Sequence, residues 1–296
     1  MSNKRPKIIA IAGPTASGKT ALAIALAKRL RGEVISADSR QIYRGMDIGT
    51  GKDKTYPQFL IDTTAPKQVW NAVKYKRATV KKIREILKRG KLPILVGGTG
   101  LYIKAILENL KIPAVKPDKK LREELEEMTT EELEEKLSRL DPEAAKTASK
   151  NKRRIIRALE VILKTGNYFS SQRQKGKPLF NALVIGIKVP REELYERINK
   201  RVNEQIKRGL VQEVKKLVKK YGENAYALQN SIAYKELLPY LRGETTLEKS
   251  IEDIKRNSRR YARRQITWFK MQPDIHWVDS KEKAEKLVNK FLNLKN

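Results

Sequence analysis

Short hydrophobic segments alternate with helix-forming segments over the first part of the chain. Apolar runs at residues 7–12, 33–37 and 92–96 have the length of buried strands, whereas the sequence from Lys19 onward and at 79–88 is helix-forming. This alternation is typical of a parallel sheet whose strands are joined by crossover helices. The pattern therefore predicts an α/β fold.

Helices alone are predicted after about residue 112. Thr129 and Glu132 form a capping-box signature, and Asp141 followed by Pro142 is typical of the start of another helix. An apolar run at 181–189 then has the pattern of a strand that returns to the sheet. A helical domain is thus expected to interrupt the α/β core.

The length and composition fit this organisation. The chain has 296 residues, of which 40% are hydrophobic, enough for a substantial core. We expect a first core segment at 1–111, a helical insertion at 112–181, and a second core segment at 182–296 that ends in basic helices. No apolar stretch approaches membrane-spanning length, and the first apolar run leads into a loop instead of a signal-peptide cleavage site. We therefore expect a cytoplasmic protein.

The composition also has a large excess of positive charge. The chain has 65 Lys and Arg residues against 34 Asp and Glu residues, a formal net charge of +31. A charged surface of the thermophile type would raise Glu along with Lys, whereas here the acidic residues are far fewer. The excess therefore indicates a polyanionic partner, for which nucleic acid is the best candidate.

Two predicted helices concentrate this charge. In the first, Ile155 and Leu159 fall on one face while Arg153 and Arg157 fall on another. In the second, residues 255–268 combine six cations with interleaved aromatic residues, and repulsion disfavours such a helix unless an anion screens it. We interpret both helices as parts of a nucleic-acid-binding surface. An ordinary solvated face is the alternative for the first.

A phosphate-binding loop follows the first predicted strand. It matches the pattern G-x-x-x-x-G-K-[ST] between a strand and a helix, which is the context that this motif requires. Backbone N–H groups of such a loop surround phosphate oxygens, Lys19 adds a point charge, and Thr20 can ligate Mg²⁺. ATP, GTP and other diphosphates present similar oxygens, so the loop alone does not define the reaction. The residues expected to bind diphosphate are Gly13, Pro14, Thr15, Ala16, Ser17, Gly18, Lys19 and Thr20.

Asp38 follows the second predicted strand. The carboxyl ends of parallel strands border the ligand crevice of open α/β sheets, so Asp38 is a candidate general base beside the phosphate loop. A turn or helix-capping aspartate is an equally good interpretation of the sequence alone.

The side-chain inventory limits the chemistry further. The chain has no Cys, which excludes thiolate catalysis and Cys-ligated zinc, and its single histidine, His276, is near the C-terminus. The strand at 92–96 ends in Gly97 and Gly98, not in an acidic residue that would organise metal and water for ATP hydrolysis. Proton transfer is therefore expected from a carboxylate, Lys or Tyr, and an ordinary NTPase is disfavoured.

Taken together, these motifs resemble the tRNA dimethylallyltransferases, also called tRNA isopentenyltransferases. The resemblance extends over nearly the whole chain, and the segment that begins Ser36-Ala37-Asp38-Ser39-Arg40-Gln41 is its most specific part. Ala233 stands where the family pattern favours Gly. The other motifs that carry the resemblance are the phosphate loop, Gly97 to Tyr102, Arg153 to Glu160, Tyr234 to Glu236, and Arg260 to Trp268.

The resemblance implies a P-loop NTPase-like parallel sheet core with an inserted all-helical domain. It also implies transfer of a dimethylallyl group from dimethylallyl diphosphate to N6 of the adenosine 3′ of the anticodon. This is position 37 of tRNAs that read codons starting with U, and the product is N6-dimethylallyladenosine. The expected partners are a tRNA anticodon stem-loop, dimethylallyl diphosphate and Mg²⁺, with no membrane, and the enzyme is expected to be a monomer.

The resemblance also suggests roles for single residues. Asp38 would be the general base, Thr99 would position the amine, and Arg201, or Arg197 one turn away, would bind the diphosphate. The residues expected to contact tRNA are Asp38, Ser39, Arg40, Gln41, Thr99, Arg153, Arg154, Ile155, Ile156, Arg157, Arg260, Arg263 and Arg264.

Three other functions fit parts of the sequence. A P-loop kinase would use the same loop for ATP, but its acidic strand ends are missing and the charge is unexplained. A non-catalytic tRNA-binding factor would keep the basic helices without needing Asp38. A transferase that acts on free AMP would not need a basic helical insertion.

Overall fold

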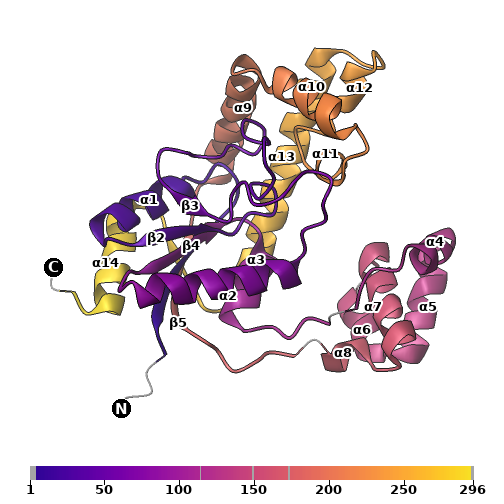
Figure 1. The fold of residues 1–296 in the computed structure, drawn as a ribbon, viewed down its shortest axis with the longest axis horizontal. Helices are drawn as coiled ribbons and strands as arrows, with labels where there is room; N and C mark the ends of the chain where they lie inside the picture. The colour runs from indigo at the N-terminus through magenta and orange to yellow at the C-terminus, as the bar shows by residue number, and fades with distance from the viewer. Residues whose placement is uncertain (1–4, 114, 149, 173, 295–296) are drawn as a thin grey trace. The chain divides into compact units, whose positions relative to one another are not determined.

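The computed structural model describes residues 5–113, 115–148, 150–172 and 174–294, drawn in Figure 1. Contacts divide the chain into two units, Met1–Leu107 with Leu179–Asn296, and Glu108–Pro178. The two segments at the beginning and the end of the second unit are hydrogen-bonded to each other. The Gly176 N–H donates to the Glu108 carbonyl at 3.1 Å, and the Lys111 N–H donates to the Gln174 carbonyl at 2.8 Å.

The first unit contains a parallel sheet that has six strands among the described residues, in the order β3-β2-β4-β1-β5-β6. The pairings of β1 with β4 and β5, of β2 with β3 and β4, and of β5 with β6 are all parallel. β1 is central and is covered on both faces, which explains its continuous apolar sequence. The strands are β1 (Lys7–Ala12), β2 (Glu33–Ser36), β3 (Gln58–Phe59), β4 (Pro93–Gly97), β5 (Asn181–Ile187) and β6 (Ile275–Val278).

Helices cover both faces of this sheet (Figure 1). Ile9 and Ile11 point to the face that packs against α1 (Lys19–Arg29) and α14 (Lys281–Leu292). The alternate residue Ile8 points to the face that packs against α2 (Ala72–Lys88) and α3 (Gly100–Leu107). The α/β fold with a parallel sheet that the alternating pattern predicted is confirmed.

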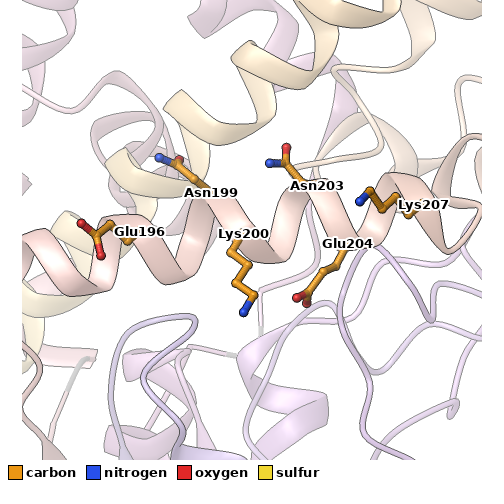
Figure 2. A pocket seen from close by; sticks show the side chains of 6 residues that line it. All are labelled: Glu196, Asn199, Lys200, Asn203, Glu204 and Lys207. Atoms are coloured by element: carbon orange, nitrogen blue, oxygen red, sulfur yellow. The ribbon is translucent and has the colours of Figure 1, made fainter.

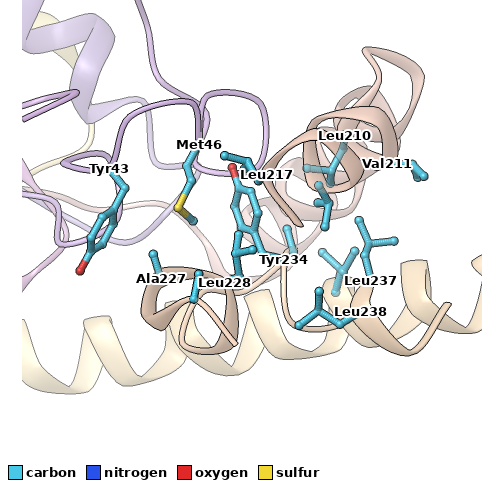
Figure 3. Packing of buried hydrophobic residues seen from close by; sticks show 14 of the residues in the cluster. Tyr43, Met46, Leu210, Val211, Leu217, Ala227, Leu228, Tyr234, Leu237 and Leu238 are labelled. Carbon is cyan, nitrogen blue, oxygen red and sulfur yellow. The ribbon is translucent and has the colours of Figure 1, made fainter. Parts of the chain in front are cut away.

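Further helices extend the first unit beyond the sheet. They are α9 (Arg191–Lys207), α10 (Leu210–Tyr221), α11 (Tyr226–Gln229), α12 (Leu238–Leu241) and α13 (Leu247–Lys270). Together with the loop around Met46 they enclose a second apolar core, in which Tyr43, Met46, Leu217 and Tyr234 lie among leucines (Figure 3). This core fixes the loop that follows Asp38.

The second unit, Glu108–Pro178, is built from helices around its own apolar core. Two of its helix starts were predicted correctly, because Thr129 and Glu132 form the capping box of α5, and Asp141 accepts from the Ala144 N–H of α6; Asp118 caps α4. The helices are α4 (Lys119–Glu127), α5 (Thr130–Leu140), α6 (Pro142–Ala148), α7 (Lys152–Thr165) and α8 (Phe169–Gln172).

Some elements differ from the expectation. α2 begins at Ala72, well before the predicted residue 79, because the Asn71 side chain accepts from the Lys74 N–H and caps the helix. The short edge strands β3 and β6 and the helix α14 were not predicted. Within the described part of the chain, none of the helices combines the length and the apolar character needed to cross a bilayer.

Candidate active site

The phosphate loop joins β1 to α1 with the geometry of an anion cradle. Gly18 has φ +86°, a left-handed conformation that glycine adopts easily, and no side chain caps the helix that begins at Lys19. Its first N–H groups are therefore oriented for an anion. The Ser17 hydroxyl is buried and has no hydrogen-bond partner among the described residues. Such a group is expected at a site that is completed by a ligand.

Lys19 carries a charge that is poised for this ligand. Its Nζ donates to the Pro14 carbonyl at 3.0 Å. Burial lowers the pKa of Lys19 to about 8, the negative charge of Asp38 opposes this shift, and the positive charge of Arg201 adds to it. The three charged groups therefore interact within one site.

The position of Asp38 fits both interpretations that the sequence left open, a turn aspartate and a residue of the ligand crevice. Its Oδ1 accepts from the backbone N–H groups of Arg40 at 2.8 Å and of Gln41 at 3.3 Å, so it does stabilise a turn. It also lines a cavity of about 280 Å³ together with Thr15 of the phosphate loop and Arg201. The hydrogen bonds of its carboxylate to the described residues all use Oδ1, which leaves Oδ2 for a substrate proton.

Thr99 holds the segment that carries Asp38. Its N–H donates to the Ala37 carbonyl at 3.1 Å, and its Oγ1 accepts from the Ser39 N–H at 3.0 Å. Tyr261, a residue that the sequence interpretation did not assign to the site, lies close enough to Thr99 and Asp38 for both to affect its pKa. Burial raises the pKa of Tyr261 to about 12 and the charge of Asp38 adds to this shift, so the phenol stays protonated. Tyr261 lines the same cavity as Asp38.

The two candidate arginines occupy different places. Arg201 lines the cavity, donates to the Thr50 carbonyl at 3.0 Å and reaches the Thr15 hydroxyl at 3.4 Å. Arg197 instead pairs with Glu193 at 2.5 Å, one turn earlier on the same helix. Arg201 is therefore the arginine next to the phosphate loop.

The basic helix α13 contributes more than charge. Gln265 is buried, accepts from the Thr15 N–H at 2.9 Å and donates to the Gly98 carbonyl at 2.9 Å. A Cβ atom at Gly98 would overlap Gln265, and one at Gly100 would overlap the Trp268 ring. Glycine at these two positions thus lets α13 approach the phosphate loop.

Two residues that sequence reasoning missed hold the loop after Asp38. Glu213 accepts from the N–H groups of Asp47, Ile48 and Gly49 at 3.0, 2.8 and 3.2 Å, and from the Tyr234 hydroxyl at 2.6 Å. Gln205 donates to the Ile48 carbonyl at 2.6 Å. Both side chains lie in helices distant in sequence, and only the family motif around Tyr234 pointed to this region.

Other predicted residues are placed as follows. Ser39 and Arg40 line the cavity, whereas Gln41 bonds to the Ser36 hydroxyl and to the Thr50 carbonyl. Arg260, Arg263 and Arg264 are exposed on α13, and of these Arg264 lines the cavity, 5.8 Å from the Tyr261 ring centre. His276 is exposed on the edge strand β6 and is not among the residues that line the cavity.

The expected tRNA contacts in α7 need correction. Arg153 and Arg154 are exposed, but Ile155 and Ile156 are buried in the core of the helical unit and cannot present their side chains to RNA. Arg157 pairs with buried Glu160 at 2.6 Å and donates to the Val115 carbonyl at 3.1 Å. The basic face of α7 is therefore narrower than expected.

The residues present are compatible with a magnesium ion held mainly by substrate phosphates. Among the described residues no cluster of three or more His, Cys, Asp and Glu side chains could hold a metal by itself. The Thr20 hydroxyl, in the first turn of α1, makes no hydrogen bond to the described residues. Mg²⁺ commonly takes few protein ligands and completes its shell with phosphate oxygens and waters, so Thr20 fits as one ligand.

A different hollow runs along α9 and differs in chemistry from this cavity (Figure 2). Its volume is about 460 Å³, and its side chains come from a single helix face of mixed charge: Glu196, Asn199, Lys200, Asn203, Glu204 and Lys207. It contains no residue of the phosphate loop, so the cavity at Asp38 is the better candidate for catalysis.

The fold and this cavity define a P-loop-like transferase in which a phosphate cradle and a carboxylate share one site. A family model described as IPP transferase matches residues 41–272. The chain belongs to this family, the tRNA dimethylallyltransferases, and the enzyme class predicted from the sequence is confirmed.

Individual relatives support the same assignment. The chain is 44% identical to a tRNA dimethylallyltransferase of Acetivibrio thermocellus, over 96% of this chain and 97% of that protein. It resembles the crystal structure of the full-length tRNA isopentenylpyrophosphate transferase of Bacillus halodurans, with a TM-score of 0.73, 40% identity, and coverage of 98% and 96% of the two chains. A eukaryotic dimethylallyltransferase structure gives a TM-score of 0.82 at 29% identity, covering 98% of this chain and 80% of the other.

Proposed function

We propose that the enzyme transfers a dimethylallyl group from dimethylallyl diphosphate to N6 of adenosine 37, the nucleotide 3′ of the anticodon, in tRNAs that read codons starting with U. A C–N bond forms at N6, the C–O bond of the donor breaks, diphosphate leaves, and the N6 proton is transferred to Asp38. The product is N6-dimethylallyladenosine. We also propose that it acts as a cytoplasmic monomer.

One observation carries this proposal: Asp38 lines the same cavity as Thr15 of the phosphate loop and Arg201. A kinase needs its phosphate cradle to hold the group that is transferred. Here the cradle can hold the leaving diphosphate while the carboxylate faces the attacking amine. The charges of Asp38 and Arg201 both affect the pKa of Lys19, which supports their close approach.

The main catalytic task is to stabilise charge on the departing diphosphate. The N–H groups at the start of α1, the Lys19 ammonium and the Arg201 guanidinium lie where this charge would develop. When bound through Thr20, Mg²⁺ would supply further neutralisation of the phosphate oxygens. Arg201 is fixed between the Thr50 carbonyl and the Thr15 hydroxyl, so little reorganisation is needed.

Asp38 would act during bond formation, not before it. An adenine amine is a very weak acid, so a carboxylate cannot deprotonate it in advance. The proton becomes acidic as the C–N bond forms, and a positioned base then contributes roughly 10²- to 10⁴-fold. The neutral Tyr261 hydroxyl lines the cavity, and Thr99 holds Ser39 next to Asp38; both residues would orient the amine.

The adenine must leave its stack to enter a cavity of this kind. The exposed arginines of α13, of which Arg264 lines the cavity, provide the charge that an extruded nucleotide and its phosphates would meet. Arg153 and Arg154 offer further exposed charge on the helical unit.

The test incubates the purified chain with an unmodified tRNA transcript, labelled dimethylallyl diphosphate and Mg²⁺, and then maps the labelled nucleoside by mass. Label at N6 of adenosine 37 is expected, and a transcript with guanosine at that position is the matched control. Transfer of the γ-phosphoryl group of ATP without use of the isoprenoid donor would favour a kinase. Equal labelling of free AMP would favour the smaller acceptor.

A further inference from the structure

A further pocket, strongly basic, lies beside the loop that Glu213 holds. Its volume is about 530 Å³. Four cationic side chains line it, Arg44 from the loop, Arg208 after α9, and Lys216 and Lys220 from α10. We refer to it as the α10 pocket. The catalytic function described above does not use it.

The cationic side chains of the α10 pocket have no acidic ion-pair partners in the described part of the chain. All four cationic residues are exposed, and none of them forms an ion pair with the described residues. The Arg44 guanidinium donates to the Thr63 carbonyl at 3.0 Å and makes no other hydrogen bond to the described residues. The one acidic residue that lines the pocket, Glu213, uses both carboxylate oxygens for four hydrogen bonds within the chain. The pocket therefore presents net positive charge to solvent.

The structure of α10 keeps this charge on one face. Leu210, Val211 and Leu217 belong to the buried cluster that contains Met46 and Tyr234 (Figure 3), so α10 cannot turn its lysines away from the surface. Lys216 and Lys220 are four residues apart, a spacing at which like charges destabilise a helix. Stability of the helix does not explain their placement.

The α10 pocket adjoins the candidate active site. Ile48 lines the α10 pocket and its neighbour Gly49 lines the catalytic cavity. On the other wall, Arg201 faces the catalytic cavity, and Arg208 lies two helical turns later at the α10 pocket. Burial lowers the pKa of Arg201, the charge of Asp38 opposes the shift, and the charge of Arg208 adds to it. One extended anion could therefore contact both sites.

We propose that the α10 pocket binds backbone phosphates of the tRNA outside the target nucleotide. This inference rests on the proposed function only in taking tRNA as the polyanion. Lys and Arg contacts to phosphates add affinity without sequence specificity, and each adds about 0.7–0.9 to the slope of log affinity against log salt concentration. The pocket would thus help to orient the tRNA while the catalytic cavity selects the base.

The test compares two double variants of α10 that remove the same charge. Lys216→Gln with Lys220→Gln removes two lysines that line the pocket, whereas Lys215→Gln with Lys219→Gln removes two exposed lysines of the same helix that do not. The first variant is expected to bind unmodified tRNA about tenfold more weakly at low salt, with a salt slope smaller by about 1.4–1.8. The second is expected to change both quantities much less. Thermal unfolding of both variants checks that α10 is intact.

Equal effects of the two double variants, or no effect of either, would overturn the inference. In that case the wild type still labels adenosine and only the α10 pocket assignment fails. If the wild type labels no adenosine but the two variants differ in tRNA binding, the proposed function fails and the inference stands. Protection of Lys216 from an amine-reactive reagent by inorganic phosphate, but not by tRNA, would also overturn it, because the pocket would then be a small-anion site.

Discussion

Gln265 in α13 accepts a hydrogen bond from the backbone N–H of Thr15 in the phosphate loop, at 2.9 Å. Its amide group donates to the Gly98 carbonyl at the end of β4, also at 2.9 Å. One buried carboxamide therefore ties the basic helix, the phosphate loop and the sheet together. The position of α13 and the shape of the phosphate loop are thereby linked.

This link predicts the effect of Gln265→Glu. A carboxylate keeps the bond from the Thr15 N–H, but it cannot donate to the Gly98 carbonyl and it places negative charge next to the diphosphate. We expect kcat/KM for dimethylallyl diphosphate to fall about 10- to 100-fold and the free energy of unfolding to fall by about 1–3 kcal/mol. Steady-state kinetics and denaturant titration measure both. Gln272→Glu, near the end of the same helix, is the control and should change little.

The pKa of Lys19 predicts a pH dependence of donor binding. Burial lowers this pKa to about 8, so the ammonium charge of the free enzyme is lost as pH rises through that value. We expect kcat/KM for the diphosphate donor to fall above pH 8 by about tenfold per pH unit. A profile that stays flat to pH 9.5 would contradict the role of Lys19. Lys19→Met should lack this pH dependence because its donor binding is already weak.

The lowered pKa of Lys19 also affects stability, but here the effect of rising pH is favourable instead of unfavourable. The pKa of Lys19 is lower in the folded state than its ordinary value of 10.5, so between about 8 and 10.5 the unfolded chain binds more protons. The contribution of Lys19 to the free energy of unfolding therefore rises with pH in this range. At pH 7 the buried charge is unfavourable, and Lys19→Met is expected to unfold at a temperature equal to or above that of the wild type.

Ala233 predicts a stabilising substitution. Its φ is +77°, a left-handed conformation that costs a residue with a Cβ atom roughly 1–2 kcal/mol. Glycine adopts this conformation without a Cβ penalty, so Ala233→Gly should raise the free energy of unfolding by about 1 kcal/mol. Ala78→Gly, inside α2, is the matched control and should lower it by about the same amount. Denaturant midpoints measure both, and destabilisation by Ala233→Gly would contradict this explanation.

Substitution of Glu213 is expected to reduce activity, although Glu213 is not proposed to contact the substrate. Glu213→Gln has only one acceptor oxygen for three N–H groups and the Tyr234 hydroxyl, so buried donors lose their partners. We expect destabilisation of about 1–3 kcal/mol and a fall of at least tenfold in kcat/KM, because Gly49 borders the cavity. Glu204→Gln, exposed on α9, should leave both unchanged.

The core of the fold could be predicted because its signals are local. β1, the phosphate loop and α1 are consecutive, and the continuous apolar run of β1 reflects burial on both sides of the sheet. The capping box at Thr129 is equally local. β3 has only two residues, and β6 has four, of which His276 and Trp277 are exposed, so neither gives a clear buried-strand pattern.

The parts of the site that the sequence did not predict depend on contacts between residues that are far apart in the chain. Gln265 is 250 residues from Thr15, and Glu213 is 164 residues from Gly49. A glutamine or glutamate in an amphipathic helix has the same local pattern whether it faces solvent or a loop. For Ile155, helical periodicity indicated a buried face correctly, whereas the family resemblance alone suggested that Ile155 and Ile156 contact tRNA.

The most direct test of the central claim is the single-turnover rate of dimethylallyl transfer by Asp38→Asn. The asparagine Oδ1 can still accept from the Arg40 and Gln41 N–H groups, so the turn is retained while the base is removed. We predict that the rate constant falls roughly 10²- to 10⁴-fold while the tRNA dissociation constant stays within about twofold of the wild type. A transfer rate within about threefold of the wild type would show that Asp38 serves only the turn, and would contradict the proposed mechanism.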